Sequence, residues 1–143
     1  MKKILYAFLL LFCFSAFTKA QSVSVEASID SLEILIGEQA KINLKVFAGS
    51  KQNILFPQYP NTLIRGVEVL EVSKADTLFH NNKEMMEVKQ EYIITSFDSA
   101  LYYIPPFEVF IDSVKYESNA LALKVYSMPV DTLNMDQFFG QKE

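Results

Sequence analysis

The sequence has 143 residues and a formal net charge of −4, and 50% of its residues are hydrophobic. This length fits a single domain, and the composition excludes a disordered chain or a coiled coil. The acidic balance argues against a nucleic-acid partner, which requires a basic protein surface. With one His and one Cys, the chain cannot assemble a His/Cys metal cluster.

The first twenty residues have the pattern of a secretory signal peptide. Lys2 and Lys3 form a positive start, the apolar run 4–17 follows, and Ala20 is the small residue that a signal peptidase requires. As a helix, this run would rise only about 21 Å, short of a bilayer core of about 30 Å. We therefore expect cleavage between Ala20 and Gln21, rather than a transmembrane anchor, and export to the periplasm or cell envelope.

Export would leave a domain without cysteine. Removing residues 1–20 takes away three lysines, no acid and Cys13, which leaves ten basic and seventeen acidic side chains and a net charge of −7. Without disulfides, the remaining chain must be stabilised by its hydrophobic core, and its length is sufficient for this.

Alternation of apolar and polar residues predicts strands through most of the remaining chain. It is clearest over 40–46, where every second residue is apolar. Residues 85–96 predict a long strand, and 101–104 are apolar on both faces, which is typical of a central strand. Further strands are expected at 23–29, 32–36, 54–56, 66–73, 107–111, 114–116 and 121–125.

Local signals add turns and one irregularity. The polar stretch 80–83 predicts a hairpin tip, because asparagine tolerates a positive φ, and Asp112-Ser113 predicts a second turn. Within 66–73 the apolar residues change phase, which predicts a β-bulge near Val69 and Leu70. Together these features predict an all-β protein, an Ig-like antiparallel β-sandwich of about seven strands over residues 21–126, with 127–143 as a tail or linker.

A short motif supports the sandwich. Asp98-Ser99-Ala100-Leu101-Tyr102 has the spacing of a tyrosine corner, in which the Tyr hydroxyl bonds to a nearby backbone group. The alternative is a turn followed by a strand that contains a Tyr by chance. Both interpretations are structural and not catalytic.

The sequence contains no pattern that predicts catalysis. His80 lies in a polar, turn-like stretch, where a solvated side chain is favoured over a catalytic one. Nucleophile-elbow, zinc, phosphate-loop, dinucleotide and calcium-loop motifs are absent from the sequence. Several acids are spread singly along the expected strand exteriors: Glu26, Glu68, Glu71, Glu87 and Glu91. We expect no catalytic, cofactor-binding or metal site, and therefore no enzyme.

Four aromatic residues flank the rigid Pro105-Pro106 pair, namely Tyr102, Tyr103, Phe107 and Phe110. Core packing is one interpretation, and an apolar ledge that receives a partner is the other. Phe107 is in phase with the apolar residues after it, so we expect it in the core. Phe110 is out of phase and is the better surface candidate.

Several stretches carry a family resemblance when they are taken in order. They are Val23-Ser24-Val25-Glu26-Ala27, Leu35-Ile36-Gly37-Glu38-Gln39, Asp98-Ser99-Ala100-Leu101-Tyr102-Tyr103-Ile104-Pro105-Pro106-Phe107-Glu108-Val109 and Tyr116-Glu117-Ser118-Asn119-Ala120-Leu121. Over residues 23–126 they resemble the amino-terminal domain of the BatD (oxygen tolerance, or aerotolerance) family, and the run from Ile104 to Val109 is the most specific part.

The resemblance implies a periplasmic Ig-like domain that associates with von Willebrand factor A-domain membrane proteins and, across the membrane, with a MoxR-type ATPase system. It supplies no catalytic residues. Members of the family carry a membrane helix near the carboxyl end, so we expect a membrane anchor here only if the chain continues beyond Glu143.

The sequence therefore predicts a non-enzymatic protein-interaction module of the cell envelope. One alternative is an extracellular ligand- or glycan-binding module of the adhesin type, although the chain has no Trp to stack on sugars. A hydrolase with acids gathered in space is the remaining alternative.

Overall fold

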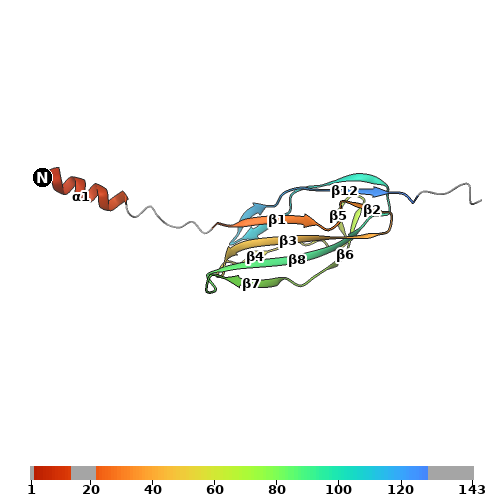
Figure 1. Ribbon diagram of the computed structural model, residues 1–143, viewed down its shortest axis with the longest axis horizontal. Helices are drawn as coiled ribbons and strands as arrows, with labels where there is room; N and C mark the ends of the chain where they lie inside the picture. Colours follow the sequence, from red (N-terminus) through yellow and green to blue (C-terminus); the bar gives the residue numbers. More distant parts are fainter. Residues whose placement is uncertain (1, 14–21, 129–143) are drawn as a thin grey trace, which may run out of the picture.

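The computed structural model describes residues 2–13 and 22–128. Within these residues a helix, α1 (Lys2–Cys13), precedes twelve strands (Figure 1). The strands are β1 (Ser24–Ile29), β2 (Glu33–Leu35), β3 (Gln39–Gly49), β4 (Ile54–Leu55), β5 (Thr62–Ile64), β6 (Val67–Val72), β7 (Asp76–His80), β8 (Met85–Thr95), β9 (Ala100–Ile104), β10 (Glu108–Ile111), β11 (Val114–Glu117) and β12 (Leu121–Tyr126).

The helix α1 coincides with much of the apolar run near the amino terminus. In the part of the chain that the structure describes, no helix is both long and apolar enough to cross a membrane. The expected cleavage site after Ala20 lies outside the described residues, as do residues 129–143 of the expected tail. Cleavage and export therefore stay predictions.

The larger layer of the sandwich is a six-stranded sheet with the order β1-β3-β8-β6-β5, in which β7 also pairs with β8. The antiparallel pair β3–β8 lies within this sheet, and the register of the pair runs without a break from Gln39 opposite Thr95 to Gly49 opposite Met85. Every second residue of β3 is buried, from Ala40 to Val46, because one face of the sheet packs on the core. The strand predicted over 40–46 is confirmed.

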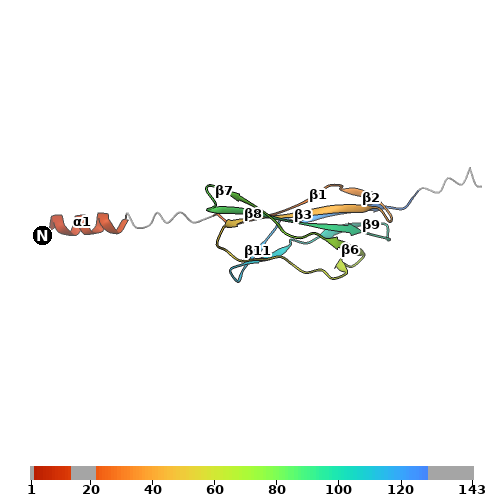
Figure 2. The same cartoon turned by 90° about the horizontal axis from the view of Figure 1, so that it is seen from below.

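Two three-stranded sheets, β11-β10-β4 and β2-β12-β9, complete the sandwich. Figure 2 shows β11 on the opposite side of the molecule from β7 and β8. The pairs within the sheets are antiparallel except β2–β12, which is parallel. The all-β sandwich predicted from the sequence is confirmed.

Side chains from both layers form one core. Its largest fully buried side chains are Tyr92, Phe107, Ile42, Leu44, Ile94, Ile104, Ile111, Leu123, Val46, Val67, Val109 and Val125. Tyr92 and Phe107 stack with their ring centroids 6.1 Å apart, so an aromatic pair joins the two layers.

The predicted turns and bulge are confirmed. Asn81, Asn82 and Lys83 all have positive φ values at the β7–β8 hairpin, and Asp112 and Ser113 have them at the β10–β11 hairpin. The pairing of β6 with β8 shifts register between Val69 and Glu71, where the phase of the apolar residues changes.

Three features differ from the sequence-based predictions. The described chain contains twelve strands rather than about seven, partly because β5 has three residues, too few to show alternation. Strand β7 was not predicted, because all five of its residues are exposed. The interpretation of 101–104 as a central strand is wrong: among the described residues β9 pairs only with β12, and it exposes Leu101 and Tyr103 to solvent.

The tyrosine corner is present. The Tyr102 hydroxyl donates a hydrogen bond to the Asp98 carbonyl oxygen at 3.0 Å and lies 3.2 Å from Ser96 Oγ. Ser96 Oγ donates to the Gly66 carbonyl oxygen at 2.7 Å. Gly66 has a φ of +91°, and a Cβ at this position would lie 2.7 Å from the Tyr102 ring, so both geometry and space require glycine here.

Candidate functional site

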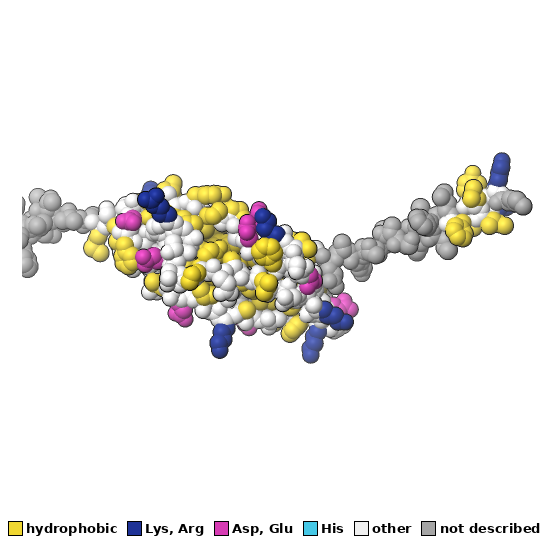
Figure 3. Space-filling view, turned by 180° about the vertical axis from the view of Figure 1, so that it is seen from behind, with side chains coloured by type: hydrophobic (Ala, Val, Ile, Leu, Met, Phe, Trp, Pro, Cys, Tyr) yellow, Lys and Arg dark blue, Asp and Glu magenta, His cyan; other side chains and the backbone are white. Residues whose placement is uncertain are grey.

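An apolar groove lies beside Pro105-Pro106, on the side of the molecule opposite the outer face of the six-stranded sheet. Its volume is about 550 Å³, and it is lined by Leu55, Phe56, Pro57, Tyr59, Leu63, Pro105, Pro106, Glu108 and Phe110. Figure 3 shows this side of the molecule, with hydrophobic side chains gathered over its middle and charged ones mostly towards its periphery. We refer to these nine residues as the apolar groove.

Strand pairing places the exposed part of the groove. β4 and β10 are antiparallel neighbours, and Leu55 lies directly opposite Phe110. Leu55 is 58% exposed and Phe110 is 41% exposed, although neighbouring Ile111 is buried. The alternation of β10 therefore sends Phe110 outwards and Val109 and Ile111 into the core. The sequence-based placement of Phe107 in the core and of Phe110 at the surface is confirmed.

Rigid groups form the walls and floor of the groove. Three of its residues are prolines, which restrict the backbone on both sides. The Tyr59 ring stands edge-on to Tyr92, with centroids 5.8 Å apart, and edge-on to Phe107 at 6.1 Å. Tyr59 is thereby fixed to the aromatic pair of the core, so little side-chain freedom is lost when a ligand covers it.

The electrostatics of the groove depend on Tyr59 and Glu108. Burial, and secondarily the negative charge of Glu108, raise the pKa of the Tyr59 hydroxyl. The hydroxyl therefore stays protonated at neutral pH and is available as a hydrogen-bond donor. Glu108 is the only charged residue in the lining, and Lys115 Nζ lies 3.4 Å from its Oε1 atom.

A basic group of a partner could compete with Lys115 for the carboxylate of Glu108. Both side chains are about half exposed, and Lys115 also lies 3.5 Å from Glu117. Glu108 is the main cause of the raised pKa of Lys115. Because exposed ion pairs contribute little, a basic group of a partner can displace Lys115 at low cost.

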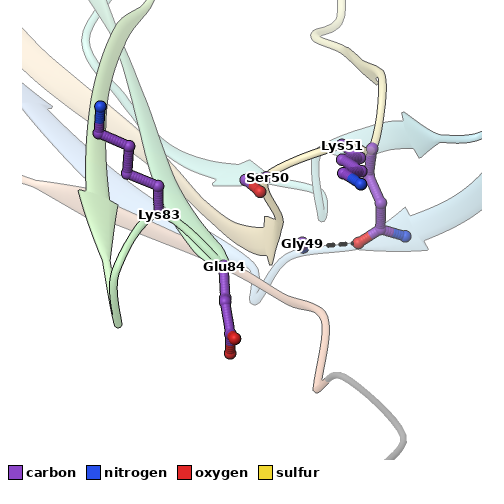
Figure 4. A pocket seen from close by; sticks show the side chains of 6 residues that line it. Gly49, Ser50, Lys51, Lys83 and Glu84 are labelled. Atoms are coloured by element: carbon purple, nitrogen blue, oxygen red, sulfur yellow. Dashed lines mark hydrogen bonds between the residues drawn. The ribbon is translucent and has the colours of Figure 1, made fainter.

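A second hollow lies at one end of the six-stranded sheet and is polar. It is lined by Gly49, Ser50, Lys51, Gln52, Lys83 and Glu84. Figure 4 shows the side chains of Lys83 and Glu84 extending in opposite directions, and Gln52 is held by the Gly49 N–H at 2.7 Å. Its charged groups do not converge on a common point, so this hollow has no arrangement that favours catalysis.

Two acidic residues on the outer face of the six-stranded sheet, Glu87 and Glu91, are paired with lysines. Glu91 lies 3.4 Å from Lys41 and 3.3 Å from Lys89, and its hydrogen bond with Lys89 is the largest cause of its lowered pKa. Across residues 2–13 and 22–128, no group of three or more His, Cys, Asp and Glu side chains could hold a metal ion. The absence of an enzymatic activity stays a prediction.

The structure separates the other aromatic candidates from the groove. Tyr102 is used by the corner, and its hydroxyl is bonded to the backbone. Tyr103 is 67% exposed on β9, outside the groove. His80, the last residue of β7, is exposed as predicted, and its Nε2 lies 3.4 Å from Glu87 Oε2.

Sequence reasoning missed the half of the groove that follows β4. In the sequence, Pro57 and Pro60 predict only the end of a strand, and nothing there marks Tyr59 or Leu63 as site residues. Side chains in a loop do not alternate regularly, so the sequence does not indicate which of them turn towards Pro105-Pro106. The available signal is Tyr59 between Pro57 and Pro60 in the loop after β4.

No protein-family model matches this chain. No curated protein matches it either.

Proposed function

We propose that this domain is a non-enzymatic protein-interaction module of the cell envelope and that it binds an extended segment of a partner protein in the apolar groove. The observation that carries the proposal is the groove itself: Leu55, Tyr59 and Phe110 present apolar surface between rigid proline walls. Aromatic anchors in preorganised pockets are the residues that dominate the binding energy of protein interfaces.

The lining defines the chemistry of the segment. An apolar side chain would cover Leu55 and Phe110, and a backbone carbonyl or other acceptor would take the hydrogen bond from the Tyr59 hydroxyl. Glu108 favours a Lys or Arg next to the apolar side chain, because a basic group would replace Lys115 as its ion-pair partner. A proline-containing segment suits such aromatic grooves, since it is already extended before binding.

The resemblance to the BatD family suggests the partner and the compartment. We propose that the domain acts in the periplasm or cell envelope and that its partner is a membrane protein with a von Willebrand factor A domain, in an assembly with a MoxR-type ATPase system. The net charge of −7 expected after removal of residues 1–20 is consistent with a basic partner segment.

Site-specific photo-cross-linking in cells tests this proposal. A benzophenone side chain replaces Phe110 in one variant and Leu101 in a control, because Leu101 is an exposed hydrophobic residue outside the groove. We expect the Phe110 probe to form an adduct with an A-domain membrane protein, and Glu108→Lys in the same chain to remove that adduct. Equal cross-linking from both positions would contradict a role for the groove.

A further inference from the structure

Strand β7 is an edge strand with one unused side. It pairs with β8 from Asp76 opposite Lys89 to His80 opposite Met85. In the part of the chain that the structure describes, β8 is the only strand with which β7 pairs. Figure 1 shows β7 at the lower margin of the six-stranded sheet. Its outer edge therefore presents backbone N–H and C=O groups that another strand can bind.

This edge lacks the features that usually prevent strands from pairing. The sequence Asp76-Thr77-Leu78-Phe79-His80 contains no proline and no lysine, and its register with β8 has no shift. Leu78 is 58% exposed and Phe79 is 50% exposed. An edge that combines regular geometry with exposed apolar side chains favours the addition of a strand.

At the opposite edge of the same sheet, a side chain binds the outer backbone groups. At β1, the Asn119 side chain accepts a hydrogen bond from the Ala27 N–H and donates one to the Ala27 carbonyl oxygen, both at 2.9 Å. Asn119 thereby occupies the backbone groups that an incoming strand would need. Of these two edges, β7 is the open one, and β5, at which the sheet also ends, has just three residues.

The side chains of β7 are complementary to those of a second, antiparallel β7. With a two-fold axis at Leu78, Leu78 lies opposite Leu78 of the second copy, and Thr77 lies opposite Phe79. Asp76 then lies opposite His80, so a carboxylate faces an imidazole at both ends of the pair. In each copy Asp76 also lies opposite Lys89, and the His80 imidazole lies 3.4 Å from the Glu87 carboxylate.

We propose that two copies of this chain form a dimer by pairing β7 with β7 in this register, which joins their six-stranded sheets into one continuous sheet. The two-fold symmetry closes the contact, so the pairing ends at two copies. Five paired residues make a small interface, so the dimer dissociates on dilution. None of the residues that line the apolar groove belongs to β7, so the groove is not part of this contact.

Cysteine cross-linking tests the register. Every variant is the full chain with Cys13→Ser, so that the introduced residue is the only cysteine. Leu78→Cys places two thiols directly opposite each other, at a Cα–Cα separation of about 4.5–5.5 Å that a disulfide can span. We expect oxidation to convert this variant to a covalent dimer.

Two matched controls make the cross-linking result specific. Leu101→Cys, on the equally exposed strand β9, reports any association by other surfaces, including α1, and should stay monomeric. Asp76→Cys should also stay monomeric, whereas Asp76→Cys combined with His80→Cys should cross-link. A dimer of Asp76→Cys alone, or equal yields from Leu78→Cys and Leu101→Cys, would overturn the register.

Sedimentation of the chain without introduced cysteines tests the dimer itself. We expect the mass to approach twice that of the chain as the concentration rises, and Leu78→Lys to abolish this increase. The control Leu101→Lys should leave the increase unchanged. If the mass stays monomeric up to millimolar concentration, or if Leu78→Lys has no effect, the β7 dimer is excluded, whatever the outcome at the apolar groove.

Discussion

Tyr102 is the residue that most directly links local sequence to tertiary structure in this domain. Its hydroxyl bonds to the Asp98 carbonyl oxygen, and its ring occupies the space in front of Gly66. The interaction joins the start of β9 to the turn before β6. The spacing of the motif predicts a hydrogen bond to a nearby backbone group, whereas the acceptor, Asp98, and the contact with Gly66 follow from the folded chain.

We expect Tyr102→Phe to lower the free energy of unfolding by about 1 kcal/mol, because it removes a hydrogen bond at a partly buried site. Tyr103→Phe is the matched control: it removes the same hydroxyl from an exposed neighbour and should have little effect. Urea denaturation of both variants measures the difference. Equal losses in the two variants would mean that the corner does not stabilise the domain.

The aromatic cluster makes stability depend on pH in the alkaline range. Desolvation is the main cause of the raised pKa of Tyr92, and it also raises the pKa of Tyr59, both above the ordinary value of 10.0. Between the unfolded and the folded pKa, the unfolded chain loses protons that the folded chain retains. The stabilising contribution of these protons is therefore complete below about pH 10 and is lost as the pH rises further.

We accordingly expect the free energy of unfolding to fall from about pH 10 upwards. Tyr92→Phe should reduce this fall, because it removes the group with the largest shift. Tyr103→Phe should leave it unchanged. Urea denaturation at a series of pH values makes the comparison, and a pH dependence that is identical in all three proteins would refute this explanation.

At the scale of the strand, an edge is stabilised by a side chain rather than by another strand. Asn119 bonds to both backbone groups of Ala27 in β1, although the two residues are 92 positions apart. We expect Asn119→Ala to lower the free energy of unfolding by about 1–2 kcal/mol, because Ala27 loses both partners. Asn61→Ala, at an exposed asparagine, is the control in the same denaturation experiment. A loss no larger than in the control would show that water replaces Asn119 without cost.

The sequence was informative where one face of a strand is buried by its own sheet. The alternation in β3 and the phase change in β6 both predicted what the structure contains, because burial there follows from local periodicity. It failed for β9, where apolar Leu101 and Tyr103 lie on an outer face. The same residues would be buried if another layer covered them, and sequence periodicity does not reveal which strands have neighbours.

The residues of the apolar groove also divide into those that local sequence predicts and those that it does not. Phe110 was placed at the surface by its phase in β10, and Pro105-Pro106 was recognised as a rigid turn. Leu63 reaches the groove from the short strand β5. Tyr59 reaches it from the loop after β4, and its position depends on ring contacts with Tyr92 and Phe107. These contacts are formed only by the complete fold, so no local pattern could predict them.

In the whole molecule, the two proposed contacts lie on different sides of the sandwich. The apolar groove is lined mainly by the loop after β4, by Pro105-Pro106 and by β10, with Leu63 of β5, and none of its residues belongs to β7. A partner segment in the groove and a second copy at β7 can therefore bind at the same time. In that arrangement the dimer would carry two grooves. A partner assembly with two segments that had bound one groove would then present its second segment to the other groove at a raised effective concentration.

Hydrogen–deuterium exchange of the domain, alone and with the periplasmic part of an A-domain membrane protein, tests the central claim most directly. Exchange reports which backbone segments become protected in the complex. The expected result is slower exchange in residues 55–63 and 105–110, which contain the groove, with no change in β9 and β12. Unchanged exchange in both groove segments, or protection confined to β9 and β12, would contradict a binding function of the groove.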